Sequence, residues 1–379
     1  MPWIELSGSI TIGKVTFWNF SRESRERILD AKLRKRLARH FRSYRSINRT
    51  PSPITICSFD GKSFYTNLNA DEYDYLREAI TALAFGSTIQ QIENRIQKKQ
   101  KHSAPPSMNA FEVISRRLDF NSDSYSHVTL SLMDLGMTES SIAFQKPLGA
   151  RGDVFVSAKW SKYLSAYLGV RSSNKRRSRI SRSLEFFRLA QAQDDFKDYS
   201  MDSAFLTRTV LLATAFESLI FHKGREASIV NGKSIRKGLK AEFFANYIDE
   251  RFKLPRSLKS TRNLENNNKK KPRRESLALI SWWAYDFYKL RNAIVHGDKV
   301  SLKRLRFKKE HWFSQMDIAV LVFADCLEDI IIKERILKPP RDKWQQLADT
   351  IFEKRGVDNW QKHHEVLGWL RSARTTNRN

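Results

Sequence analysis

Residues 291–297, which read Arg-Asn-Ala-Ile-Val-His-Gly, combine a fixed cation, an amide and a titratable imidazole. Asn292 and His296 are four residues apart, so on a helix they share one face, with Arg291 beside them. An imidazole can move a proton near neutral pH. A guanidinium can stabilise the extra charge that builds on phosphorus in a transition state. These residue types at this spacing therefore suit the cleavage of a phosphodiester.

The spacing has a second possible meaning, because a histidine at a helix end often binds the last carbonyls and interacts with the helix dipole. On spacing alone this structural role is the more common one. The same spacing also recurs at Arg306 and His311. Arg306, however, lies in the cationic stretch 303–309, where any histidine would have an arginine nearby, whereas Arg291 follows an apolar helical pattern. Polar groups placed there cost packing energy unless they are paired or used.

The elements that would position these residues are long helices. Apolar stripes predict helices over 201–221, 276–296 and 315–336, with Gly297 as the stop of the second. Shorter helices are expected at 342–354 and 360–371. The insert 255–274, rich in Lys, Arg and Asn, is expected to be a solvated loop.

The N-terminal part of the chain shows mainly strand signals. Apolar residues alternate around Gly13, at 127–132, at 142–144 and at 154–156, residues 54–57 are β-branched, and Asp60-Gly61 predicts a hairpin turn. Helical spacing occurs at 29–41 and 71–85, the latter capped by Asn69 or Asp71. The predicted fold class is α+β: a β-rich mixed domain over 1–165, followed by an all-α bundle over 180–379.

Two segments resemble a known family. Residues 290–297, Leu-Arg-Asn-Ala-Ile-Val-His-Gly, are similar to the signature of the HEPN superfamily. Residues 214–220, Thr-Ala-Phe-Glu-Ser-Leu-Ile, resemble the acidic helix segment of its ApeA-like branch. The resemblance covers residues 180–340, and the first domain is only loosely similar to the β-rich domain of such proteins.

The resemblance implies a helical domain that dimerises and brings two Arg-Asn-His sets into one cleft. Catalytic HEPN proteins are metal-independent endoribonucleases, often toxins or antiviral effectors. Carried onto this chain, His296 would act as general acid/base or position the ribose 2′-hydroxyl, and Arg291 would stabilise the charged phosphorus. Asn292 would orient a phosphate oxygen or the imidazole. Glu217 would hold the fork of Arg291, although an interhelical salt bridge without a catalytic role is an equal alternative.

The charge of the chain favours a polyanionic partner. Its 68 Lys and Arg against 41 Asp and Glu give a net charge of +27. Four segments carry much of the excess: 22–49, 171–182, 256–274 and 299–309. Each alone could be ordinary solvated surface. Together they predict RNA-binding residues: Arg176, Arg177, Lys269, Lys270, Lys271, Arg273, Arg274, Lys303 and Arg304.

Several classes of function are disfavoured. Only Cys57 and Cys326 are present, and His363 and His364 are adjacent, so neither a metal nor another cofactor is expected. The absence of long apolar segments and of a signal peptide predicts a cytoplasmic protein that does not enter the membrane. RNA suits metal-free chemistry better than DNA because it supplies its own 2′-hydroxyl nucleophile.

The sequence therefore predicts a cytoplasmic homodimeric ribonuclease of antiphage or toxin type that cuts tRNA or mRNA and responds to a phage-derived trigger or regulatory partner. The alternative is a non-catalytic HEPN protein that binds RNA or serves as an adaptor. A nucleotidyl-accepting antitoxin partner fits less well, because no tyrosine closely follows His296.

Overall fold

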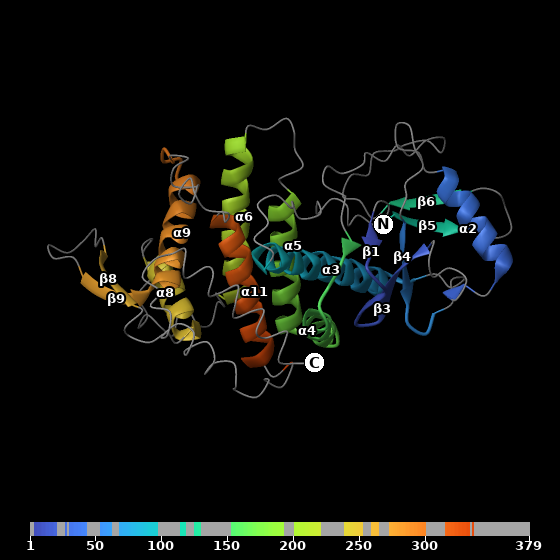
Figure 1. Cartoon of the computed structure of the whole chain (residues 1–379), viewed down its shortest axis with the longest axis horizontal. Helices are drawn as coiled ribbons and strands as arrows, with labels where there is room; N and C mark the ends of the chain where they lie inside the picture. Colours follow the sequence, from blue (N-terminus) through green and yellow to red (C-terminus); the bar gives the residue numbers. More distant parts are fainter. Residues whose placement is uncertain are drawn as a thin grey trace. The chain divides into compact units, whose positions relative to one another are not determined.

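The chain is an α+β protein, as the sequence predicts (Figure 1). Its contacts divide it into two compact units: unit 1 is Met1–Gln91 with Ala104–Asp198, and unit 2 is Ile92–Ser103 with Tyr199–Asn379. The structure is a computed structural model that describes residues 4–20, 27–28, 30–43, 54–62, 68–97, 114–118, 125–129, 153–192, 201–220, 239–252, 259–264, 273–300, 315–333 and 336.

Unit 1 contains a three-stranded antiparallel sheet in the order β2 (Ile10–Ile12), β3 (Val15–Asn19) and β4 (Thr55–Phe59). Its first turn needs Gly13, whose φ is 61° and at which a Cβ would lie 2.1 Å from the hydroxyl oxygen of Tyr75. The predicted Asp60-Gly61 turn follows β4, and the second strand of that predicted hairpin lies largely outside the described residues.

Two further pairs of strands occur in unit 1. β1 (Glu5–Leu6) pairs in parallel with β7 (Asp153–Val154), and β5 (Ile114–Leu118) pairs antiparallel with β6 (Tyr125–Thr129). The alternating patterns at 127–132 and 154–156 thus mark strands, at shifted boundaries. The predicted strand at 142–144 lies outside the described residues.

In the described part of the chain, four helices accompany these strands: α2 (Ala31–Ser43), α3 (Ala70–Gln97), α4 (Ala158–Leu168) and α5 (Lys175–Ala192). The end of α3, from Ile92 onward, belongs to unit 2. Helix α3 starts at the predicted cap, because Asn69 Oδ1 accepts the N–H of Glu72 at 3.0 Å and Glu72 Oε2 accepts the N–H of Asn69 at 2.8 Å. It continues well beyond the predicted end at residue 85.

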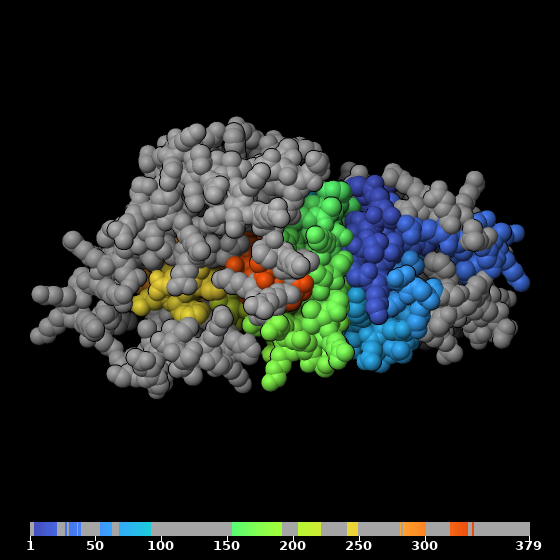
Figure 2. Space-filling model, turned by 90° about the horizontal axis from the view of Figure 1, so that it is seen from below, coloured from blue at the N-terminus to red at the C-terminus, as the bar shows by residue number. Residues whose placement is uncertain are grey.

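Aromatic packing joins α4 and α5 to unit 1. The ring of Phe85 on α3 meets Trp160 of α4 at 5.3 Å and Phe187 of α5 at 5.0 Å, both edge to face. Figure 2 shows the green surface of α4 and α5 beside the dark blue residues 4–20 of the same unit. The division of the chain therefore follows α5, whereas the sequence placed it between residues 165 and 180.

Unit 2 is built from α6 (Met201–Ile220), α8 (Leu239–Phe252), α9 (Leu279–Val295) and α11 (Gln315–Lys333). Its core centres on Phe216 of α6. The ring of Phe216 lies 4.9 Å from that of Phe244, 5.4 Å from that of Phe323 and 6.2 Å from that of Phe287. One residue thus joins α6 to α8, α11 and α9. The apolar stripes predicted α6, α9 and α11, whereas α8 was not predicted.

The insert between α8 and α9 corrects the sequence prediction. Instead of a solvated loop over 255–274, it contains the antiparallel strands β8 (Lys259–Leu264) and β9 (Arg273–Ala278). Their register pairs Arg262 with Glu275. Because β9 occupies residues up to Ala278, α9 begins three residues later than predicted. The helices expected at 342–354 and 360–371 lie outside the described residues.

Candidate active site

The candidate site lies at the C-terminal end of α9, where the helix stops as predicted. Gly297 adopts a φ of 75°, its N–H binds the carbonyl of Ile294 at 3.1 Å, and the N–H of Asp298 binds the carbonyl of Ala293 at 2.9 Å. This double hydrogen bond is a Schellman motif, which closes a helix and requires a left-handed residue. His296 therefore occupies the last helical turn, and its side chain is exposed.

Arg291 is held by three neighbours. Its Nη2 lies 3.3 Å from Glu217 Oε1, and its Nη1 donates to Asn292 Oδ1 at 3.1 Å. Its guanidinium carbon lies 5.6 Å from the centre of the Tyr288 ring, within cation–π range. The Arg291 and Glu217 side chains are 21% and 20% exposed. Partial burial screens this ion pair less than a surface pair, so it can fix the guanidinium.

Glu217 reaches Arg291 because aromatic packing aligns α6 with α9. Phe216 packs against Phe287, and the next residue on each helix forms the next contact, in which the hydroxyl of Tyr288 donates to Glu217 Oε1. The hydrophobic core thus sets the register of the polar contact. The ion pair that the sequence predicted between Glu217 and Arg291 is present.

The guanidinium of Arg291 presents one edge for binding an anion. Its Nε is buried and has no hydrogen-bond partner among the described residues. Each Nη carries two hydrogens, and the contacts to Glu217 and Asn292 engage one on each. The remaining Nη hydrogens are the donors that a phosphate oxygen could reach.

His296 is linked to Arg291 through Asn292. The N–H of His296 binds the carbonyl of Asn292 at 3.0 Å, so helical geometry extends to the histidine and places both side chains on one face. Arg291 and His296 are separated by about 7.5 Å along the helix axis. His296 is exposed, so a substrate can reach its imidazole from solvent.

Tyr288 is the site residue that the sequence did not reveal. It lies three residues before Arg291 and so shares its helix face. Its position in an apolar, aromatic stripe hides it among the core residues Trp283 and Phe287. A signal was nevertheless available, since a buried tyrosine needs a partner for its hydroxyl and an acidic residue was predicted on the neighbouring helix.

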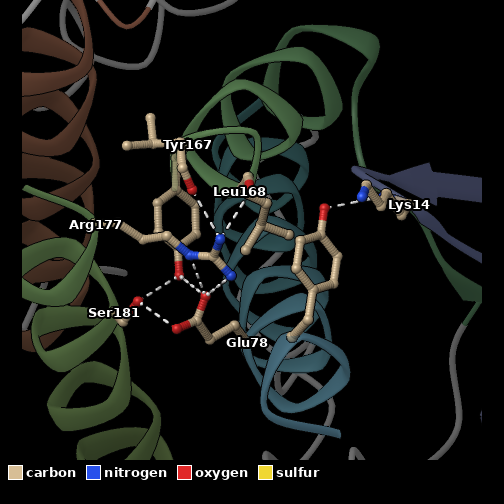
Figure 3. A network of polar contacts seen from close by, with 8 residues as sticks. Lys14, Glu78, Tyr167, Leu168, Arg177 and Ser181 are labelled. Atoms are coloured by element: carbon tan, nitrogen blue, oxygen red, sulfur yellow. Dashed lines mark hydrogen bonds and ion pairs between the residues drawn. The ribbon is translucent and has the colours of Figure 1, made fainter. Parts of the chain in front are cut away.

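The structure places Arg176 and Arg177 very differently. Arg176 is exposed at the start of α5, where it remains a predicted RNA contact. Arg177 is buried, and its Nε and Nη2 bind Glu78 Oε2 at 2.8 and 2.7 Å. Its Nη1 donates to the carbonyls of Leu168 and Val170 at 3.2 and 2.8 Å (Figure 3). Arg177 is therefore a structural cation of unit 1, not a surface contact for RNA.

The surroundings of Arg177 explain this correction. Ser181 Oγ donates to Glu78 Oε1 at 2.9 Å, and the hydroxyl of Tyr167 lies 2.9 Å from the same Oγ. Burial, together with the charge of Glu78, raises the pKa of Tyr167, so this phenol stays protonated. Arg177 also belongs to the buried stripe that continues at Ile180, Leu184 and Phe187. This helical spacing predicts that Arg177 is buried, although its neighbours in the sequence are basic.

The other predicted RNA-binding residues have no described side chains. Arg273 and Arg274 begin strand β9, opposite Leu264 and Asn263 of β8. Lys269, Lys270, Lys271, Lys303 and Arg304 lie outside the described residues.

Neither a metal-binding cluster nor a membrane-spanning helix is found in the described ranges. No group of three or more His, Cys, Asp or Glu residues there could hold a metal ion. None of the described helices is long and apolar enough to cross a membrane.

Comparisons with known proteins add no relative. No protein-family model, no curated protein and no solved structure matches the chain. The HEPN resemblance therefore rests on residues 214–220 and 290–297 alone.

Proposed function

We propose that this protein is a metal-independent endoribonuclease of HEPN type. The observation that carries the proposal is the arrangement at the end of α9. A guanidinium anchored by Glu217 and Asn292 precedes an exposed imidazole by little more than one turn. A fixed cation beside a free acid/base group is the minimum that cleavage of RNA needs.

In the proposed reaction the ribose 2′-oxygen attacks phosphorus and the bond to the 5′-oxygen breaks, leaving a 2′,3′-cyclic phosphate and a 5′-hydroxyl. The imidazole of His296 accepts the proton of the 2′-hydroxyl. The free Nη edge of Arg291 stabilises the charge on the phosphoryl oxygens, and Asn292 orients a phosphate oxygen. In a homodimer, the imidazolium of the partner subunit's His296 would give the proton to the leaving oxygen.

The biological setting follows from the same proposal. A net charge of +27 would steer a polyanion to the protein, so tRNA or mRNA is the proposed substrate. We propose a cytoplasmic effector of antiphage or toxin type that a phage-derived trigger or a regulatory partner activates.

Incubation of the purified full chain with end-labelled tRNA and mRNA, with and without EDTA, tests the proposal. We expect fragments with cyclic-phosphate ends that persist in EDTA and that the variants His296→Ala and Arg291→Ala do not produce. Circular dichroism of both variants checks the fold. Normal cleavage by both variants would overturn the site assignment, and loss of cleavage on chelation would overturn the metal-free mechanism.

The closure of α9 favours a second candidate function, a non-catalytic RNA-binding or adaptor protein. The Schellman motif gives Gly297 and the turn around His296 a sufficient structural role without chemistry. This candidate predicts RNA binding that weakens steeply with salt and leaves the RNA intact. The cleavage assay described above separates the two functions directly.

A further inference from the structure

We infer that Tyr288 is a positioning residue for RNA cleavage, acting through Glu217 on Arg291. The inference rests on the proposed function and adds a residue to which neither the motif nor the resemblance assigns a role. Tyr288 contacts both members of the ion pair: its hydroxyl donates to Glu217 Oε1, and its ring lies 5.6 Å from the guanidinium carbon of Arg291.

The carboxylate of Glu217 is the cross-helix anchor of Arg291. The hydrogen bond from Nη1 goes to Asn292, which is the neighbour of Arg291 on α9 and therefore does not tie the guanidinium to another helix. The buried Nε adds no anchor among the described residues. The direction of the guanidinium relative to α6 therefore depends on where the Glu217 carboxylate is held.

Tyr288 is suited to hold that carboxylate. It is 1% exposed, and a buried phenol with two rotatable side-chain bonds has little freedom to move. Its hydroxyl binds the same oxygen, Oε1, that faces Arg291 Nη2. Removing the hydroxyl would free that oxygen to rotate away and would let the guanidinium follow it, with little effect on the surrounding apolar contacts.

The competing explanation is that Tyr288 is only a core residue, since its ring also lies 6.3 Å from that of Phe244. Tyr247 provides a matched control. Its hydroxyl donates to Asp329 Oδ2 at 3.2 Å, joining α8 to α11 in the same unit. It is thus another tyrosine–carboxylate contact between helices, and it lies outside the Arg291 contacts described above.

The test is a double-mutant cycle with Tyr288→Phe and Glu217→Gln in the full chain, with Tyr247→Phe as control. Single-turnover cleavage of labelled RNA is measured over a range of protein concentrations. We expect Tyr288→Phe to lower the maximal rate constant about tenfold while half-saturation changes less than about twofold, because the lost bond acts on a charged group. The double variant should be no slower than Glu217→Gln alone, since both changes break one chain of contacts.

Three outcomes decide the matter. The inference is wrong if the reductions in cleavage rate constant multiply in the double variant. It is also wrong if Tyr288→Phe cleaves at the wild-type rate, or if Tyr247→Phe loses as much activity as Tyr288→Phe. Thermal unfolding of each variant excludes a trivial loss of fold. If the wild-type chain leaves all RNA intact, both the proposed function and the inference about Tyr288 are wrong. Cleavage by the wild type that is lost in Arg291→Ala but not slowed in Tyr288→Phe overturns the inference alone.

Discussion

The two units each contain a tyrosine, a glutamate and an arginine in contact, and the difference between the two sets separates a structural site from a candidate active site. In unit 1 each guanidinium nitrogen of Arg177 has an acceptor, on Glu78 or on the carbonyls of Leu168 and Val170 at the end of α4. In unit 2 the Nε of Arg291 has no acceptor among the described residues. The Arg177 side chain is 7% exposed and that of Arg291 is 21% exposed.

This comparison shows that an Arg–Glu pair by itself does not indicate function. Four of the five N–H donors of Arg177 bind Glu78 or the carbonyls at the end of α4, and the side chain is buried. The contacts to Glu217 and Asn292 use two of the five donors of Arg291. The two arginines differ in the number of acceptors around the guanidinium group, and not in the presence of a carboxylate. The same substitution at both positions should therefore give opposite results.

Arg291→Lys should give the largest effect. Lysine keeps the positive charge but cannot reach Glu217 and Asn292 with a planar fork. We expect RNA cleavage to fall at least about 100-fold, because the charge would no longer be fixed where phosphate negative charge develops. The melting temperature should change little. Cleavage at the wild-type rate would show that position 291 needs only a positive charge.

Arg177→Lys should reverse this pattern. The substitution removes part of a buried network, and we expect it to lower the free energy of unfolding by about 2 kcal/mol. Urea denaturation measures the loss. RNA cleavage by the folded protein should stay within about twofold of wild type. A stable protein with weakened RNA binding would restore Arg177 as an RNA contact.

Tyr167→Phe tests the unit 1 network through pH. The pKa of Tyr167 is raised in the folded chain, so above its ordinary value of about 10 the unfolded state ionises first. The stability that this group contributes is complete below pH 10 and declines above it, by about 1.4 kcal/mol per pH unit. Urea denaturation between pH 9 and about 11 should show a less steep decline in Tyr167→Phe than in wild type. Equal slopes would contradict the burial of this phenol.

Gly297→Ala is expected to have a small effect on stability, and Gly61→Ala is its control. Both glycines have a positive φ, 75° and 70°, and a Cβ at either would meet no atom within 4 Å. Each substitution should cost about 1 kcal/mol through backbone strain alone. Gly297→Ala should in addition slow RNA cleavage, because it disturbs the turn that carries His296, and Gly61→Ala should not. If both variants cleave RNA at the same rate, the turn at Gly297 is not needed for the cleavage reaction.

Part of the fold follows directly from the sequence. The apolar stripe of 201–221 and the Gly297 stop predict α6 and the end of α9, because helix periodicity and left-handed glycine act locally. The cap at Asn69 is predicted for the same reason. Strand β8 was missed because its basic, polar composition is typical of loops, while backbone pairing depends on a partner strand distant in sequence.

The candidate site shows the same limit. Arg291, Asn292 and His296 lie on one helix and can be found from spacing. The contact from Tyr288 to Glu217 joins residues 71 positions apart, and depends on how Phe216 meets Phe287. Arg177 was misassigned because its neighbours in the sequence are basic, whereas in space it contacts Glu78 and two carbonyls at the end of α4. Residues that act across helices become visible only when the packing is known.

The exposed last turn of α9 also makes this protein convenient for site-specific labelling. Val295 is 51% exposed and directly precedes His296. The chain contains two cysteines: Cys326 is buried, and burial raises the pKa of the Cys57 thiol. At neutral pH a thiol-reactive fluorophore should therefore react preferentially with the variant Val295→Cys. Such a dye would sit one residue from the imidazole and would report the arrival of RNA as a change in emission.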